Sequence, residues 1–205
     1  MGKLDLAVGY LSGAMEYVAD HGVGWRRDFI TQLHGVCPNI DLIDPTNKPG
    51  GEDMKIGENK AHQNQLKEDG KFLELAEYVN RYRRCDLRFV DISDFMVVAI
   101  DPNEVPQWGT ANETYVGEAQ HKPTFFLCDG GAHKFPNWLF DLLEFHGNLP
   151  TNIFDSIESL VGMLHTIDSG DKELSKEWVL VRKWIEMNRQ ARMEIIEMQS
   201  RHLAP

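Results

Sequence analysis

Glu113 is the strongest candidate for a residue that takes part in chemistry, because it follows a short glycine-containing turn in the segment Gly109-Thr110-Ala111-Asn112-Glu113. We expect a helix to begin at Gly109 and Thr110, with Thr110 as its N-cap and Glu113 in its first turn. Gly109 permits a close approach of the backbone to a ligand. The helix dipole favours an ionised carboxylate there by up to about 1 kcal/mol. Such a carboxylate beside a ligand acts as a base or a nucleophile. The competing interpretation is that Glu113 only stabilises the first turn.

The elements around Glu113 determine where it points. An apolar run, Phe95 to Ile100, indicates a buried strand, which the chain leaves at Asp101-Pro102. The helix that carries Glu113 ends before Lys122-Pro123, and Thr124 to Cys128 supplies the next strand. In open α/β sheets, ligands bind in the crevice beyond the carboxyl ends of the strands. We therefore expect Glu113 to face that crevice.

Strand and helix signals alternate along the rest of the chain. They predict an α/β fold in a single domain, with a mainly parallel five-stranded sheet flanked by helices, of the flavodoxin or Rossmann-like type. The other predicted strands are 4–11, 39–43 and 153–154, and the other predicted helices are 25–36, 70–84 and 156–165, the last capped by Asp155 or Ser156. We assign residues 1–170 to this domain. Residues 171–205 form a C-terminal extension with a long helix, 172–201, whose surplus apolar residues pack on a partner subunit or on the domain itself.

Two loops, Arg26 and the end of the first strand are further candidates for ligand binding. Residues 15–24 contain Gly22 and Gly24 and read as an active-site loop, and residues 46–65 read as a polar lid or insertion. Arg26, at the start of the next helix, either contacts an anionic group such as a 5′-phosphate or is a solvated surface residue. Ser12-Gly13 ends the first strand and presents backbone N–H groups to a ligand.

Composition limits the function classes. The net charge of −11 and a pI of about 5.1 argue against a protein that binds the backbone of a nucleic acid polymer. The three cysteines are widely spaced, which indicates thiols in a reducing cytoplasm rather than a disulfide framework. We expect no signal peptide and no membrane span. Asp129 and His133 are too few for a metal site.

Three motifs resemble those of the nucleoside 2-deoxyribosyltransferase family, which includes related deoxynucleotide N-glycosidases. The first is Gly109-Thr110-Ala111-Asn112-Glu113, followed by Gly117, Ala119 and Lys122-Pro123. The second is the Asp86-Leu87 step before the preceding strand, and the third is the strand end Tyr10-Leu11-Ser12-Gly13-Ala14. Together they span residues 4–128 in the order that the family shows.

The resemblance implies a role for each matched residue. Glu113 is the nucleophile, Tyr10 hydrogen-bonds it, and Asp86 contacts the base and helps its protonation. On the residues alone, Tyr10 is equally a core aromatic and Asp86 a surface acid. The family is oligomeric and needs no cofactor or metal. This chain departs from the family at Pro106-Gln107-Trp108, where an acid often binds the sugar hydroxyls, so Asp101 or Glu104 has to serve instead. Ala14 replaces a proline.

The function implied is transfer of a 2-deoxyribosyl group from a deoxynucleoside to a free base through a covalent Glu113 intermediate. Two alternatives remain. One is hydrolysis of deoxynucleoside 5′-monophosphates, with Arg26 or the Ser12-Gly13 backbone holding the phosphate. The other is a non-catalytic module that binds a nucleotide derivative.

Overall fold

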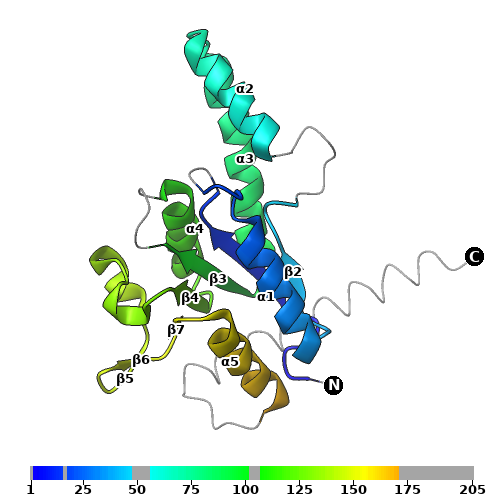
Figure 1. The fold of residues 1–205 in the computed structure, drawn as a ribbon, viewed down its shortest axis with the longest axis vertical. Coiled ribbons are helices and arrows are strands. Elements are labelled where there is room, and N and C mark those ends of the chain that lie inside the picture. The colour runs from blue at the N-terminus through cyan, green and yellow to red at the C-terminus, as the bar shows by residue number, and fades with distance from the viewer. Residues whose placement is uncertain (1, 16–17, 48–55, 102–106, 171–205) are drawn as a thin grey trace, which may run out of the picture.

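Five parallel strands form the centre of the computed structural model, which describes residues 2–15, 18–47, 56–101 and 107–170. Their order is β2-β1-β3-β4-β7, and every neighbouring pair is parallel. The strands are β1 (Val8–Gly13), β2 (Asp41–Ile43), β3 (Phe95–Ile100), β4 (Thr124–Cys128) and β7 (Ile153–Phe154). The predicted α/β class and five-stranded parallel sheet are therefore confirmed (Figure 1).

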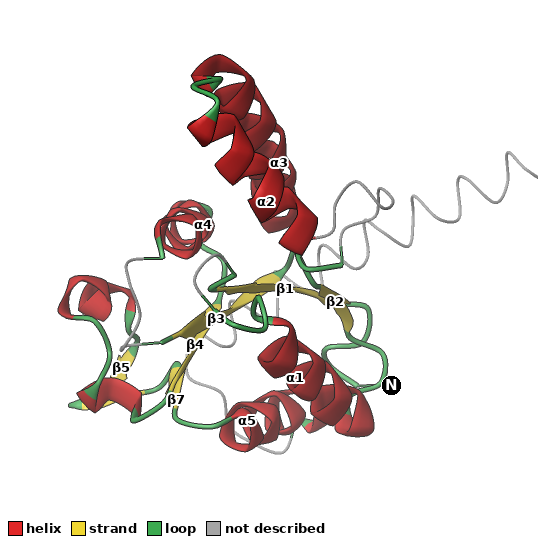
Figure 2. Ribbon diagram, turned by 45° about the horizontal axis from the view of Figure 1, so that its top comes forward, coloured by secondary structure: helices red, strands yellow, loops and turns green. Residues whose placement is uncertain are grey.

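Helices cover both faces of this sheet (Figure 2). On one face lie α1 (Val23–Val36) and α5 (Ile157–Ser169), and on the other lie α3 (Phe72–Ile92) and α4 (Trp108–Ala119). Because side chains alternate along a strand, β1 contributes to two separate cores. Leu11 packs with the α1 residues Phe29 and Leu33, while Tyr10 packs with Met96 and the α3 residue Val90.

A helical hairpin occupies much of the segment that we expected to be a loop. Residues 56–68 form α2 (Ile56–Glu68), which runs beside α3 and projects with it away from the sheet (Figures 1 and 2). The prediction of an irregular 46–65 segment is thus wrong for its second half, and residues 48–55 lie outside the described residues. The strongly polar sequence of α2 hides its helical character, because only a narrow stripe that includes the buried Leu66 needs to be apolar.

The remaining elements are short. Two 3-10 helices, Gly131–His133 and Asn137–Leu142, precede a small antiparallel pair, β5 (Phe145–His146) and β6 (Leu149–Pro150). Of the two predicted caps of α5, Asp155 and Ser156, the structure has Ser156, whose hydroxyl accepts the Ser159 N–H at 3.2 Å. The expected 172–201 helix, and with it the expected self-association surface, lies outside the described residues. Among the helices that are described, none is long and apolar enough to cross a membrane.

Candidate active site

The strand order places a crevice between β1 and β3. After β1 the chain enters α1 on one face, and after β3 it enters α4 on the other face, so the two connections diverge at the carboxyl edge of the sheet. Such a switch point is where open α/β sheets bind ligands. Ser12 and Gly13 of β1 lie beside Val98 and Ala99 of β3 at this edge.

Two hydroxyl groups from β1 hold the carboxylate of Glu113. The Tyr10 hydroxyl donates to Oε1 at 2.9 Å, and the Ser12 hydroxyl donates to Oε2 at 2.5 Å. Tyr10 and Ser12 are two residues apart, so both side chains point to the α4 face of the sheet. Both are fully buried and Glu113 is 9% exposed. A carboxylate has about four lone-pair positions, so two acceptor positions of Glu113 remain after these two bonds.

The burial of Glu113 changes its acidity. Its pKa is raised from the ordinary 4.5 to about 7, mainly by burial and in addition by the charge of Asp86. The hydrogen bonds from Ser12 and Tyr10, and the charge of Arg26, oppose this rise because they favour the ionised form. Burial also raises the pKa of Tyr10 well above its usual value, so its hydroxyl keeps its proton and donates it.

The position of Glu113 on its helix differs from the prediction. Helix α4 begins at Trp108 with Gln107 as its N-cap, so Glu113 lies in the second turn. Thr110 is not the cap: it is buried inside the helix, where its carbonyl accepts a hydrogen bond from the Thr114 hydroxyl. The helix dipole therefore acts on Glu113 more weakly than expected, since its effect falls off within the first turn. The two hydroxyls of β1 hold the carboxylate instead.

Close packing fixes the height of α4 above the sheet. Gly117 lies one turn after Glu113, and a Cβ at this glycine would collide with Sδ of Met96 on β3. Met96 is itself fully buried and has little space in which to move. The absence of a side chain at Gly117 thus brings α4, and with it Glu113, within reach of Tyr10 and Ser12.

Asp86 approaches the same carboxylate from α3. This helix was expected to end at Arg84, but it continues to Ile92 and carries Asp86 in its second half. Asp86 is half-buried, and its charge raises the pKa of both Glu113 and Tyr10. The structure therefore brings Tyr10, Asp86 and Glu113 together from three elements.

Arg26 is neither solvated nor directed into open space, which corrects the surface interpretation. It is fully buried and donates to three carbonyls, those of Leu11 at 3.1 Å, Gly13 at 3.0 Å and Gly22 at 2.8 Å. Its Nε also lies 3.7 Å from a carboxylate oxygen of Asp44. Arg26 thus joins the end of β1 to the start of α1, and it fixes the strand end that carries Ser12.

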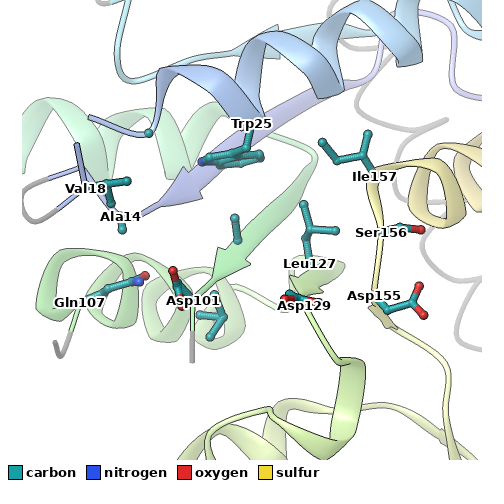
Figure 3. Close-up of a pocket in the computed structure, with 13 residues that line it drawn as sticks. Ala14, Val18, Trp25, Asp101, Gln107, Leu127, Asp129, Asp155, Ser156 and Ile157 are labelled. Carbon is teal, nitrogen blue, oxygen red and sulfur yellow. The ribbon is translucent and has the colours of Figure 1, made fainter. Parts of the chain in front are cut away.

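A cavity of about 350 Å³ opens at this edge of the sheet (Figure 3). Its apolar walls include Trp25, Ile100 and Leu127, and Gln107 and Asp101 lie together at one end. The other lining residues are Ala14, Val18, Gly22, Ala99, Asp129, Asp155, Ser156 and Ile157. Glu113 does not line this cavity. The lining residues Trp25 and Ala99 are the ones that a Cβ at Gly13 would meet, whereas Ser12, which binds Glu113, points to the opposite face of β1.

Gly109 was predicted as a substrate-binding residue, but nothing in the described part of the structure requires a glycine at this position. Gly109 is exposed, and a Cβ there would meet nothing within 4 Å, so the protein itself does not require its glycine. Sequence reasoning missed the part that the Ser12 hydroxyl plays, because it considered only the backbone there. It also missed Trp25 and Gln107. Within the described ranges, no group of three or more His, Cys, Asp or Glu side chains is arranged to hold a metal ion.

Comparisons with known proteins give limited similarity. No protein-family model matches the sequence, and no curated protein matches it significantly. Among solved structures, a 2-desoxiribosyltransferase from Leishmania mexicana is similar at a TM-score of 0.47 and 15% identity, over 78% of this chain and 97% of that one. A conserved protein from Enterococcus faecalis V583 is similar at a TM-score of 0.36 and 18% identity, over 89% of this chain and 99% of that one.

Proposed function

We propose that this protein cleaves the N-glycosidic bond of 2′-deoxynucleosides and transfers the deoxyribosyl group to another base, with Glu113 as the nucleophile. The observation that carries the proposal is the buried Glu113 carboxylate, bound on both oxygens by Tyr10 and Ser12 at the switch point of the sheet. A nucleophile held by hydrogen bonds to fixed strand residues is already oriented before the substrate arrives.

The chemistry has two steps. In the first, a Glu113 oxygen forms a bond to C1′ as the C1′–N bond breaks, and the electron pair of that bond leaves with the base. Asp86 supplies the proton that the departing base takes up. In the second, an incoming base attacks C1′, returns a proton to Asp86 and releases the Glu113 carboxylate. Water in place of the second base gives hydrolysis.

The ionisation of Glu113 suits this role near neutral pH. With a pKa of about 7, its ionised and protonated forms are both populated there. Only the ionised form attacks C1′, and it is held by Tyr10 and Ser12. As positive charge develops on the sugar in the transition state, the carboxylate of Glu113 stabilises it, and Asp86 gains negative charge nearby as its proton passes to the base.

The cavity favours an unphosphorylated substrate over a 5′-monophosphate. Asp101, Asp129 and Asp155 line it, and none of the described lining residues is Lys, Arg or His. Three carboxylates repel a phosphate dianion. The N-terminus of α5 also faces this cavity, but the Ser156 hydroxyl already accepts one of its N–H groups, and Asp155 and Glu158 add negative charge there. The donors of Arg26 serve backbone carbonyls.

A chromatographic exchange assay tests the proposal. The purified protein is incubated with 2′-deoxyadenosine and free thymine or cytosine, beside the Glu113→Ala and Glu113→Gln variants. Glu118→Gln is the matched control, since Glu118 is an exposed glutamate on the same helix. We expect a new deoxynucleoside with the unmodified protein and the control, and none with either Glu113 variant.

The other outcomes separate the alternatives. Free deoxyribose without exchange identifies a hydrolase, and cleavage of 5′-monophosphates but not nucleosides contradicts the electrostatic argument. Ligand binding that survives Glu113→Ala, with no turnover by the unmodified protein, identifies a binding module and refutes the catalytic proposal.

A further inference from the structure

The end of β1 extends beyond the strand beside it. Strand β2 pairs with β1 from Val8 to Tyr10 and stops there, whereas β1 continues beside β3 as far as Gly13. Alternate residues of a strand turn their backbone groups toward opposite neighbours, so every second carbonyl past Tyr10 points to the side that β2 has left. Buried carbonyls in such a place need donors from elsewhere in the fold.

The guanidinium of Arg26 supplies these donors from α1. Its Nε donates to the Leu11 carbonyl at 3.1 Å, and Nη2 donates to the Gly13 carbonyl at 3.0 Å. A third bond, from Nη1 to the Gly22 carbonyl at 2.8 Å, ties the guanidinium to the start of its own helix. Because Arg26 is fully buried, water does not compete for these carbonyls. The planar fork of Arg26 therefore supports the end of β1 as a longer β2 would.

Ser12 lies between the two peptide carbonyls that Arg26 holds. Its side chain points to the opposite face of the strand, where its hydroxyl donates to Oε2 of Glu113. A shift of the two held peptide units therefore moves this hydroxyl. Tyr10, which donates to Oε1, lies where β2 still pairs with β1. The Ser12 bond thus depends on Arg26 more than the Tyr10 bond does.

The charge of Arg26 also acts on Glu113, and this effect has to be separated from its position. Burial lowers the pKa of Arg26, while a carboxylate oxygen of Asp44, directly after β2, lies 3.7 Å from Nε and opposes that fall. The positive charge favours the ionised form of Glu113, whereas the charge of Asp86 disfavours it. The groups whose charges act on the guanidinium are Asp44, Tyr10, Glu113 and Asp20. A test of position must therefore keep a positive charge at residue 26.

We infer that Arg26 is a positioning residue for Glu113: it holds the end of β1 in place so that the Ser12 hydroxyl stays on the carboxylate. Its consequence for turnover rests on the proposed function, whereas its effect on the carboxylate does not. The guanidinium is needed for its shape, since a lysine ammonium is a point charge on a flexible stem and lacks the rigid fork. A change that keeps the charge and removes the fork is therefore the decisive one.

Carbon-13 NMR of the full chain, labelled at the glutamate side-chain carboxyl, follows the ionisation of Glu113 directly, and Glu113→Gln assigns its resonance. Arg26→Lys is titrated with pH in the otherwise unmodified protein and in Ser12→Ala. Arg27→Lys is the matched control, because Arg27 is an exposed arginine of the same helix in an ion pair with Asp28. Circular dichroism and thermal unfolding establish that each variant is folded during the titration.

We expect Arg26→Lys to raise the midpoint of the Glu113 titration, about 7 in the unmodified protein, by roughly one unit. This is a tenfold change in the ionisation equilibrium, as for the loss of one hydrogen bond to a charged group. In Ser12→Ala the midpoint is already raised, and Arg26→Lys adds little to it. Arg27→Lys leaves the midpoint unchanged in both backgrounds. Under the proposed function, Arg26→Lys also lowers kcat roughly 10-fold or more with little change in KM, because the carboxylate is misplaced for attack.

Two results overturn the inference. An unchanged midpoint in folded Arg26→Lys shows that the Ser12 bond does not need the guanidinium. Equal shifts with and without the Ser12 hydroxyl show that Arg26 acts on Glu113 by another route.

A second variant covers the case in which Arg26→Lys does not fold. Arg26→Gln then takes its place, since it puts no charge in the core. The lost charge shifts the midpoint in both backgrounds, and the difference between the two shifts tests the positioning. Failure of the proposed function is a separate result: the unmodified protein then shows neither exchange nor hydrolysis, and the titrations alone decide the role of Arg26.

Discussion

Replacing Glu113 by glutamine is expected to stabilise the protein at neutral and alkaline pH, and the effect is expected to disappear in acid. In the folded state burial raises the pKa of Glu113 from 4.5 to about 7. Between these pH values the folded protein holds a proton that the unfolded chain has released, so the free energy of unfolding falls as pH rises. At 1.36 kcal/mol per pH unit, the fall amounts to about 3 kcal/mol once the pH exceeds 7. The glutamine of the Glu113→Gln variant never ionises, so the variant does not undergo this fall.

Urea denaturation at a series of pH values from 4.5 to 8.5 measures the effect. The quantity of interest is the difference in the free energy of unfolding between Glu113→Gln and the unmodified protein. We expect it to rise by about 3 kcal/mol between pH 4.5 and pH 7 and then to level off. A constant offset, from altered hydrogen bonds to Tyr10 and Ser12, does not affect this rise.

Glu118→Gln again serves as the control, because an exposed substitution on the same helix is expected to change stability by less than about 0.5 kcal/mol. A difference for Glu113→Gln that stays flat with pH would refute the reasoning. It would mean that Glu113 ionises in the folded protein as easily as in the unfolded chain, and that burial does not control the carboxylate.

Three further predictions concern residues that bind Glu113 or fix the strand and helix around it. Ser12→Ala removes a hydrogen bond that favours the ionised carboxylate, so under the proposed function the midpoint of the rise of kcat/KM with pH, expected near 7 for the unmodified protein, moves upward. Arg26→Met leaves three buried carbonyls without their donor and lowers the free energy of unfolding by about 3 kcal/mol or more, measured in urea. Gly117→Ala places a methyl group against Met96, lowers stability by about 1–3 kcal/mol and reduces kcat, because α4 moves away from the strand.

A matched control variant exists for Arg26→Met and another for Gly117→Ala. Arg27→Met removes an exposed arginine from the same helix, and Gly35→Ala adds a methyl group where nothing lies within 4 Å. The first is expected to change stability little, and the second to raise it by up to about 1 kcal/mol, since alanine favours a helix over glycine. Equal effects of Arg26→Met and Arg27→Met would contradict the role given to the buried guanidinium. An unchanged pH midpoint in Ser12→Ala would contradict the role given to its hydroxyl.

The sequence predicts those elements whose signal is local. Strands β3 and β4 agree with the prediction residue for residue, because continuous apolar runs are bounded by Asp, Pro and Lys. Strand β1 is displaced, being observed at Val8–Gly13 instead of 4–11. The apolar residues Leu4 and Ala7 are indeed buried, but they precede the strand. Burial alone therefore does not locate a strand end.

Tertiary partners decide what local signals miss. From the sequence, Arg26 was interpreted as a surface charge, because the residues beside it in the sequence do not indicate its partners. The carbonyls of Leu11 and Gly13 come within reach of Arg26 only when the chain folds. Gln107 enters the sequence analysis only as part of the Pro106-Gln107-Trp108 departure from the family, since its amide, to which no described residue hydrogen-bonds, becomes visible only when the cavity is known. The pairing of Tyr10 with Glu113 was implied by the family resemblance, whereas that of Ser12 was not.

The end of β1 connects the two halves of the site. Its side chains that face α4, Tyr10 and Ser12, hold Glu113, while the carbonyls of Leu11 and Gly13 hold Arg26. A displacement of this strand end therefore changes the position of Glu113 and the wall of the cavity together. Binding in the cavity and ionisation of Glu113 are accordingly expected to be coupled: a ligand that seats firmly against the end of β1 fixes the hydroxyls that stabilise the carboxylate.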